Sequence, residues 1–247
     1  MDNAEAIGAD HDVPYAQDTI TILHSVGPKL TKVWKTDGSI SGYGNAAHFT
    51  VEERPVASFD DLCRVLKLLE NDPCACVIRG KLRNDWREVL AKNLPVWNAE
   101  RRRKAEKDRV EFIPLNPTGN QIVRRQDLFI DAPHHWMLAD VDNFSMNKGE
   151  TYTKAIERYI KTLPPEFHNI SYYWQMSASA GHARHDGKLK VHLWFWLAKK
   201  ATGAELREWS KNAPVDSSVF LTVQPHYTAA PVFEQGAPVP ALTRSGP

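Results

Sequence analysis

The stretch that decides the fold is Trp136-Met-Leu-Ala-Asp-Val-Asp142. A short apolar run followed by two acids on either side of a valine predicts a strand. Side chains two residues apart on a strand point to the same face. We therefore expect Asp140 and Asp142 to project together, while Ala139 and Val141 face the core.

The two carboxylates of this strand are a candidate metal site. They repel each other unless a cation lies between them. Oxygen ligands suit hard divalent cations, and phosphoryl-transfer sites typically combine one or two carboxylates with substrate phosphates. The same pair at a strand end that faces solvent would be ordinary, so Asp140 and Asp142 alone leave both interpretations open.

Further polar groups are expected on the hairpin that follows. Lys190 and His192 alternate with apolar residues on its second strand, on the face opposite to the apolar one. A lysine and a histidine are costly on a buried strand unless they meet an anion or a carboxylate. With the hydroxyls of Ser177 and Ser179, and Gly181 allowing close backbone approach, they form a candidate triphosphate cradle. The alternative is a histidine with satisfied hydrogen bonds beside tryptophans.

A third acid, Asp216, lies at the start of a further expected strand. Its ordinary role would be that of a turn or cap residue. Its interest comes from the order along the chain, which is an acid pair, then a serine-rich turn with a histidine strand, then a single acid.

Around these motifs the chain alternates between short strands and helices, which predicts an α/β or α+β fold. Ser58 begins a helix with acids in its first turn, and residues 71–73 end it. The strand before this helix and the strand after it give a βαβ-like pattern. Strands are expected at 19–23, 74–78, 136–142, 170–179, 188–197 and 215–223, and further helices at 151–163 and 202–211.

The expected organisation is a single large domain between two short segments. Residues 1–18 form a polar lead without periodicity, and residues 237–247 form a linker-like tail. The domain at 19–236 divides into an N-terminal α/β unit at about 19–125 and a motif-bearing unit at about 126–236.

Composition is neutral about nucleic acid, because 31 Lys and Arg balance 30 Asp and Glu. Any such contact must come from a local patch, and Arg101, Arg102, Arg103 and Lys104 are the candidate. A solvated helix or loop is the alternative for this run. Three cysteines, no apolar run of about 20 residues and a polar start predict a cytoplasmic protein that does not enter a membrane.

The order of motifs resembles the archaeo-eukaryotic primase superfamily, especially the primase-polymerases of plasmids, phages and mobile elements. That family carries an hhhDhD/E strand, an s-x-H strand and an hD/E strand. The first corresponds to Met137–Asp142 and the third to Val215-Asp216. The second corresponds to Lys190-Val-His192, with lysine where a small residue is usual. The segment Gln224–Pro231 also looks like the stretch after the third motif in mobile-element members.

The resemblance implies a primase-type core in which an α/β unit and an RRM-like unit enclose the catalytic cleft. It implies DNA-templated nucleotidyl transfer, as a primase, a DNA polymerase or both, in the replication of a mobile element or phage. Asp140, Asp142 and Asp216 would hold two Mg²⁺ or Mn²⁺ ions, and His192 and Lys190 would bind the triphosphate of an NTP or dNTP. Arg79 and the basic run at 101–104 are weaker candidates for nucleotide or template phosphates. The expected partners are a single-stranded DNA template and a helicase domain or protein.

Two other functions remain open at this point. A rolling-circle nicking enzyme or relaxase needs a histidine pair on one metal and a tyrosine nucleophile. His134 and His135 point oppositely on a strand, which argues against a shared ion. A non-enzymatic single-strand-binding module would use Trp194 and Trp196 as stacking platforms, although core packing is as good an explanation for them.

Overall fold

The computed structural model describes residues 17–247. The expected lead at 1–18 therefore lies outside the described residues except for its last two positions. Asp18 already begins β1 (Asp18–Ser25), so the first strand starts one residue earlier than the sequence suggested. The fold is a mixed α+β arrangement, and within residues 17–247 no helix has the length and apolar character to cross a bilayer.

The first sheet has the strand order β3-β1-β4, with β3 at Phe49–Val56 and β4 at Ala75–Ile78. Strand β1 is antiparallel to both neighbours, so β3 and β4 run parallel, and α1 (Phe59–Leu69) connects them. As predicted, Ser58 caps α1, and its side chain accepts a hydrogen bond from the Asp61 amide at 3.2 Å. The strand that runs parallel to β4, on the other side of β1, is β3, which the sequence did not reveal, because half of its residues are polar and it lies at a sheet edge.

The second sheet repeats this plan in the order β11-β8-β9-β7. Helix α3 connects two parallel strands, β7 and β8, and β9 lies antiparallel between them. The expected hairpin is present as β8 and β9, and Thr151 caps α3. The bounds are β7 His134–Ser145, α3 Tyr152–Ile160, β8 Tyr172–Met176, β9 Lys188–Ala201 and β11 Ser245–Gly246.

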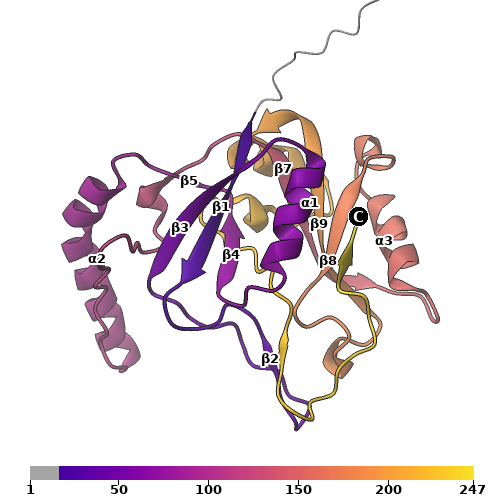
Figure 1. The fold of residues 1–247 in the computed structure, drawn as a ribbon, viewed down its shortest axis with the longest axis horizontal. Coiled ribbons are helices and arrows are strands. Elements are labelled where there is room, and N and C mark those ends of the chain that lie inside the picture. Colours follow the sequence, from indigo (N-terminus) through magenta and orange to yellow (C-terminus); the bar gives the residue numbers. More distant parts are fainter. Residues whose placement is uncertain (1–16) are drawn as a thin grey trace, which may run out of the picture.

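The remaining elements lie at the margins of the two sheets. The long helix α2 projects on the far side of the first sheet (Figure 1), and α4 begins at a capping box on Thr202. They are α2 Trp86–Asp108, α4 Gly203–Trp209, and the paired short strands β2 Val33–Trp34 with β10 Val232–Phe233 and β5 Lys81–Leu82 with β6 Phe129–Ile130.

Two expectations about the C-terminal part were wrong. Residues 215–223 form no strand but a short 3₁₀ helix, η5 (Ser217–Phe220), because the Asp216 side chain accepts from the Ser218 amide and starts a turn. The tail at 237–247 does not behave as a linker, since β11 pairs with β8 and extends the second sheet.

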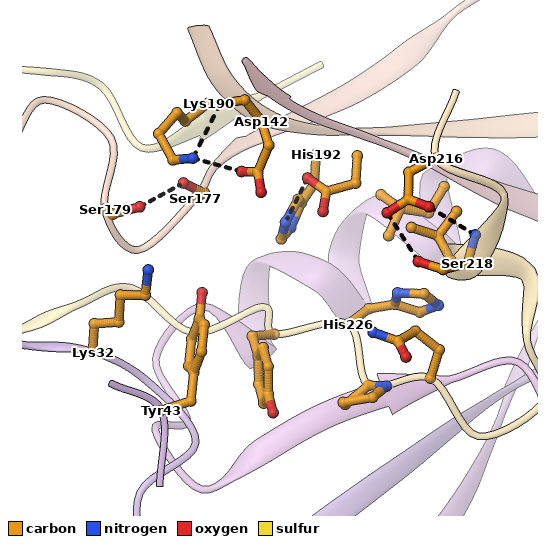
Figure 2. A pocket seen from close by; sticks show the side chains of 16 residues that line it. Lys32, Tyr43, Asp142, Ser177, Ser179, Lys190, His192, Asp216, Ser218 and His226 are labelled. Carbon is orange, nitrogen blue, oxygen red and sulfur yellow. Dashed lines mark hydrogen bonds and ion pairs between the residues drawn. The ribbon is translucent and has the colours of Figure 1, made fainter. Parts of the chain in front are cut away.

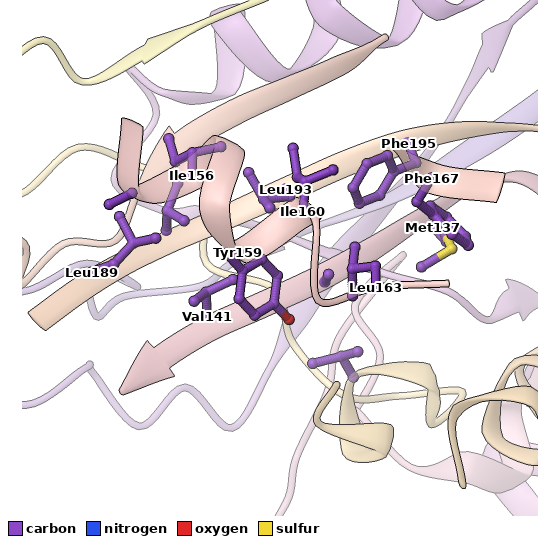
Figure 3. Packing of buried hydrophobic residues seen from close by; sticks show 14 of the residues in the cluster. Met137, Val141, Ile156, Tyr159, Ile160, Leu163, Phe167, Leu189, Leu193 and Phe195 are labelled. Carbon is purple, nitrogen blue, oxygen red and sulfur yellow. The ribbon is translucent and has the colours of Figure 1, made fainter. Parts of the chain in front are cut away.

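Three apolar layers hold the sheets together. One lies between the second sheet and α3, and its strand residues include Met137, Val141, Leu193 and Phe195 (Figure 3). A second joins α1 and the first sheet to the other face of the second sheet, through Trp136, Leu138, Tyr173 and Trp194. The third packs α2 and the segment 115–129 against the outer face of the first sheet. Between Trp136 and Val141 the alternation along β7 therefore sends odd-numbered residues to α3 and even-numbered ones toward the first sheet.

Candidate functional site

A polar cavity of about 200 Å³ opens where the layer between the two sheets ends. On β7 the face that carries Trp136 and Leu138 continues with Asp140 and Asp142, and on β9 the Trp194 face continues with His192 and Lys190. The cavity brings together seven of the sequence-predicted residues, which come from four separate segments of the chain: Asp140, Asp142, Asp216, Ser177, Ser179, Lys190 and His192. Figure 2 shows the cavity and labels all of them except Asp140.

Asp140 and His192 face each other at the centre of the cavity wall that β7 and β9 form. They are cross-strand partners in the β7–β9 ladder, and Asp140 Oδ1 lies 3.5 Å from His192 Nε2. Within the described residues, neither Asp140 Oδ1 nor His192 Nδ1 has a hydrogen-bond partner. Burial raises the pKa of Asp140, and the negative charges of Asp142 and Asp216 add to this rise while His192 opposes it. A positive charge placed at this carboxylate would offset both the energetic cost of burying it and its repulsion by the other two acids.

Asp142 is held differently, by the lysine that the sequence assigned to the triphosphate. Lys190 Nζ donates to Asp142 Oδ1 at 2.7 Å and to the Asp142 carbonyl at 3.1 Å. Burial alone would raise the pKa of Asp142, but the Lys190 hydrogen bond and the positive charges of Lys190, His192 and Lys32 together outweigh it, and the pKa falls. Because the Asp142 side chain is 59% exposed and Lys190 is buried, the lysine holds this carboxylate at the solvent edge of the cavity.

Asp216 reaches the cavity as the cap of η5. Its Oδ1 accepts from the Ser218 amide at 2.8 Å and its Oδ2 from the Ser218 hydroxyl at 2.9 Å. The three acids therefore share one cavity, but each has its own local arrangement. Among residues 17–247 no three His, Cys, Asp or Glu side chains lie close enough together to form a ready-made metal centre.

The donor set nevertheless suits a hard divalent cation. All three acids supply carboxylate oxygens, the ligands that Mg²⁺ and Mn²⁺ prefer. The unpartnered Asp140 Oδ1 and the mutual repulsion of the acids are what a bound cation would resolve.

Residues 177–181, which we call the serine turn, form one side of the cavity. Ser177 and Ser179 are buried, and their hydroxyl oxygens lie 3.5 Å apart. The turn is closed by the Ala180 amide, which donates to the Ser177 carbonyl at 2.9 Å. Gly181 has a φ of +82°, which favours glycine. Buried hydroxyls whose partners are mainly each other can contribute hydrogen bonds to a bound anion.

The opposite wall consists of residues that sequence reasoning missed. The rings of Tyr43 and Tyr227 stack with centroids 3.9 Å apart, and Lys32 Nζ lies 4.9 Å from the Tyr43 ring centroid. Burial and the charge of Lys190 lower the pKa of Lys32, while Asp142 raises it. Lys32 and Tyr43 lie in irregular segments without any sequence signal, whereas Tyr227 falls in the stretch 224–231 that the family resemblance pointed to.

His226 closes the inner end of the cavity. It is buried, its backbone pairs with Val77 of β4, and its Nε2 has no partner within the described residues. Burial, with the charges of His192 and Arg79, lowers the pKa of His226 to about 3. The His226 imidazole is therefore neutral at physiological pH and adds no positive charge to the cavity.

Arg79 does not belong to the cavity. Its Nη1 donates to the Trp136 carbonyl at 2.7 Å, its Nη2 donates to the Ala201 carbonyl at 2.8 Å, and its guanidinium lies over the Trp136 ring. The side chain is buried, so we assign it to the packing of the two sheets rather than to nucleotide phosphates. Trp194 is also fully buried, which removes it as a stacking platform, while Trp196 stacks on His135.

The basic run at 101–104 lies on α2, away from the cavity. Arg101 Nε donates to the Ile113 carbonyl at 2.6 Å, and the Arg102 guanidinium lies over the Phe112 ring. Arg103 and Lys104 are exposed. None of the four lines the cavity, so they form a separate surface.

Comparisons of the chain with protein-family models, with curated proteins and with solved structures gave no match.

Proposed function

We propose that this protein is a DNA-templated nucleotidyl transferase, a primase-polymerase of the archaeo-eukaryotic primase type. One observation carries the proposal. Three motifs that are far apart in the sequence, at 140–142, 190–192 and 216, converge on one cavity beside the serine turn. Their acids, their histidine and the hydroxyls are the groups that binding a metal-bound triphosphate requires.

The cation would be held by Asp140 and Asp142, with Asp216 as the third carboxylate. Bound Mg²⁺ or Mn²⁺ ions would activate the attacking 3′-hydroxyl and stabilise the departing pyrophosphate. Lys190 keeps the Asp142 carboxylate in the cavity wall through its 2.7 Å hydrogen bond. Asp216 is kept in place by both of its bonds to Ser218.

The nucleotide would lie between the two walls of the cavity. His192 and the hydroxyls of Ser177 and Ser179 are positioned to donate to triphosphate oxygens on one side, and Lys32 supplies charge from the other. The cavity is smaller than the roughly 300–1,000 Å³ of a typical small-molecule site. We therefore expect it to enclose the phosphates and to leave the base near the exposed parts of Tyr43 and Tyr227.

The arrangement of the second sheet supports the RRM-like part of the proposal. The order β8-β9-β7, with α3 between β7 and β8 and α4 after β9, agrees with the first three strands of such a unit. The place of its fourth strand, beside β7, is occupied by η5, which carries Asp216 at its start. The N-terminal sheet faces it across the apolar layer, and the cavity lies at the end of that layer.

A single-stranded DNA template and either ribo- or deoxynucleoside triphosphates complete the proposal, with replication of a mobile element as the setting. The exposed Arg103 and Lys104 are the candidates for template phosphates. A helicase partner and a cytoplasmic location stay predictions.

The two rival functions find less support. His134 Nδ1 faces Asp18 and His135 Nδ1 faces the Leu197 carbonyl, so the two rings make separate contacts rather than sharing an ion. A pure binding module would place three acids on its nucleic-acid surface, where they would repel phosphate.

The test is nucleotide incorporation on circular single-stranded DNA, with and without a primer, in Mg²⁺ or Mn²⁺. The wild type is compared with the double variant Asp140→Ala, Asp142→Ala. Metal-dependent products that the variant loses would support a polymerase, and products without a primer would support a primase. Tight DNA binding without any incorporation would favour the binding module.

A further inference from the structure

The serine turn is held from outside by a segment that the sequence analysis took for a linker. Strand β11 pairs with β8, in the register Ser245 opposite Gln175 and Gly246 opposite Trp174. The Met176 amide donates to the Arg244 carbonyl at 2.7 Å, which extends this pairing to the last residue before the turn. Residues 240–246, which we call the C-terminal strap, therefore run along the edge from which the serine turn leaves the sheet.

Arg244 fixes the first peptide groups of the turn. Its Nη2 donates to the Met176 carbonyl at 3.1 Å and to the Ser177 carbonyl at 2.8 Å. The Ser177 carbonyl is the same acceptor that closes the turn through the Ala180 amide. The next carbonyl, of Ala178, accepts from Trp34 Nε1 at 3.0 Å. With both carbonyls held from outside, the peptide groups that carry the two serines have little freedom to rotate.

The strap also packs against the far end of the turn. A Cβ atom added to Gly181 would lie 2.7 Å from Leu242 Cδ2 and 2.8 Å from Pro240 Cβ. The close approach of these side chains requires a glycine at position 181, in addition to the positive φ. The strap thus touches the serine turn at both of its ends.

A partly buried polar cluster anchors the strap to the first half of the chain. The Ser245 hydroxyl bonds to Glu70 Oε2 at 2.5 Å, and Lys67 Nζ contacts both of these groups at 3.0 Å. Lys67 lies in the last turn of α1, and Glu70 caps that helix. The strap therefore couples the serine turn to a rigid helix end rather than lying loosely on the surface.

Arg244 has N–H donors that no carbonyl or carboxylate oxygen of the described residues accepts. Within the described residues its Nε and Nη1 are buried without partners, although the guanidinium keeps its two carbonyl contacts. Burial lowers the pKa of Arg244, while the charge of Glu70 raises it. An arginine buried at such cost indicates a role beyond covering the sheet edge.

We propose that Arg244 is a positioning residue, which acts through the C-terminal strap to hold Ser177 and Ser179 in the conformation that binds a nucleoside triphosphate. This inference rests on the proposed function, because it gives the serine turn that ligand. Arg244 does not line the cavity, so its effect reaches the ligand only through the turn.

The test is a double-mutant cycle on triphosphate affinity, measured by titrating dATP with Mg²⁺ into the full chain. Arg244→Gln should weaken binding about tenfold, and Arg244→Lys, which keeps a charged donor, should recover part of the loss. In a Ser177→Ala, Ser179→Ala background, Arg244→Gln should change the affinity less than twofold. Arg64→Gln, the same change at an exposed α1 arginine, should leave the affinity unchanged.

An equal loss in both backgrounds would overturn the proposal, because it would mean that Arg244 acts independently of the serines. So would an unchanged affinity in Arg244→Gln. Amide hydrogen exchange at residues 177–181, without nucleotide, should speed up in Arg244→Gln and not in Arg64→Gln. If the wild type binds no triphosphate, the proposed function fails, and this exchange measurement alone decides whether the strap holds the turn.

Discussion

Strand β7 contributes one residue to each of two aspartate–histidine pairs, one at its first residue and one near its middle, and the two pairs differ in how completely their polar atoms are used. At the first end, His134 Nδ1 lies 2.8 Å from Asp18 Oδ1, and His134 Nε2 lies 2.8 Å from the Arg79 carbonyl. The second Asp18 oxygen accepts from the His135 amide. Both ring nitrogens of His134 and both carboxylate oxygens of Asp18 therefore face a partner inside the fold.

In the second pair, Asp140 Oδ1 and His192 Nε2 are 3.5 Å apart, and within the described residues each side chain keeps one atom without a partner. Both pairs join two strands. Buried polar groups in folded proteins are almost always satisfied, so the exceptions call for an explanation. We call Asp18–His134 the closed pair, which stabilises the junction of the two sheets. We call Asp140–His192 the open pair, which lies on a cavity wall and is free to bind a ligand.

The largest effect that we expect from altering either pair is the loss of nucleotide incorporation when the open pair is changed. Asp140→Asn removes the carboxylate charge and should lower nucleotide incorporation by about 10²–10³-fold, the scale expected when one preorganised contact to the reacting groups is lost. The folded state should not suffer, because burial and two neighbouring acids already disfavour that charge. Steady-state incorporation on primed DNA and thermal unfolding check the two statements. Activity within twofold of wild type would break the contrast.

The closed pair should show the opposite behaviour. Asp18→Ala leaves His134 and the His135 amide without their acceptor, and breaking a buried pair in this way typically costs about 3–5 kcal/mol. Urea denaturation should report a loss of that order. Incorporation per folded molecule should stay close to that of wild type, because Asp18 lies outside the cavity. A loss below about 1 kcal/mol would contradict the structural role.

The two pairs should affect the pH dependence of stability in opposite directions, because the pKa of Asp18 is lowered and that of Asp140 is raised. Burial alone would raise the pKa of Asp18, but the bonds from His134, His135 and Thr19 lower it below its usual value. Its stabilising contribution is therefore complete above the unfolded-state value near 4 and is lost as the pH falls through the lower folded value. Asp18→Asn should flatten the fall of the unfolding free energy between about pH 5 and 2.

Asp140 has the reverse sign, because its folded pKa is raised. Its ionisation costs stability at neutral pH, and the cost disappears as the pH falls through the folded value. Asp140→Asn should therefore have a free energy of unfolding at least as large as that of wild type at pH 7. At acid pH, where the wild-type carboxyl is protonated, the variant should have no such advantage. Denaturation curves of both variants at several pH values test the pair of statements, and parallel curves would refute them.

The smallest expected effect is on thermal stability in the presence of metal. At a free Mn²⁺ concentration ten times the dissociation constant, binding adds about 1.4 kcal/mol, or roughly 3–6 °C in melting temperature. Wild type and Asp18→Asn should show this shift, and Asp140→Asn should not. An equal shift in all three would place the cation elsewhere.

The sequence predicted the acid pair well because strand alternation is local. Asp140 and Asp142 meet because both lie on the even-numbered face of one strand. His192 joins them because it lies opposite Asp140 on the neighbouring strand. The serines were expected close by because they follow the partner strand of the same hairpin, although that strand ends at Met176 rather than at residue 179. Asp216 was found from motif order, although its predicted strand is a 3₁₀ turn that the residue itself initiates.

Apart from the turn at 215–223 and the edge strand β3, the errors and omissions involve contacts across long stretches of chain. Arg79 looks like a phosphate ligand in sequence, and only the carbonyls of Trp136 and Ala201, 57 and 122 residues away, reveal its packing role. Lys32 reaches the cavity from an irregular segment. The C-terminal strap has the composition of a linker, yet Arg244 meets Ser177 across 67 residues.

The most direct measurement is to locate the cation relative to the two histidines. Substoichiometric Mn²⁺ is added to the protein with ¹⁵N-labelled histidine, and the broadening of each ring resonance is recorded. Because paramagnetic broadening falls steeply with distance, the His192 signal should be lost first, while that of His134 should persist. Asp140→Asn should abolish the difference. Broadening of His134 before His192, or no selective broadening in the wild type, would contradict the assignment of the open pair as the functional one.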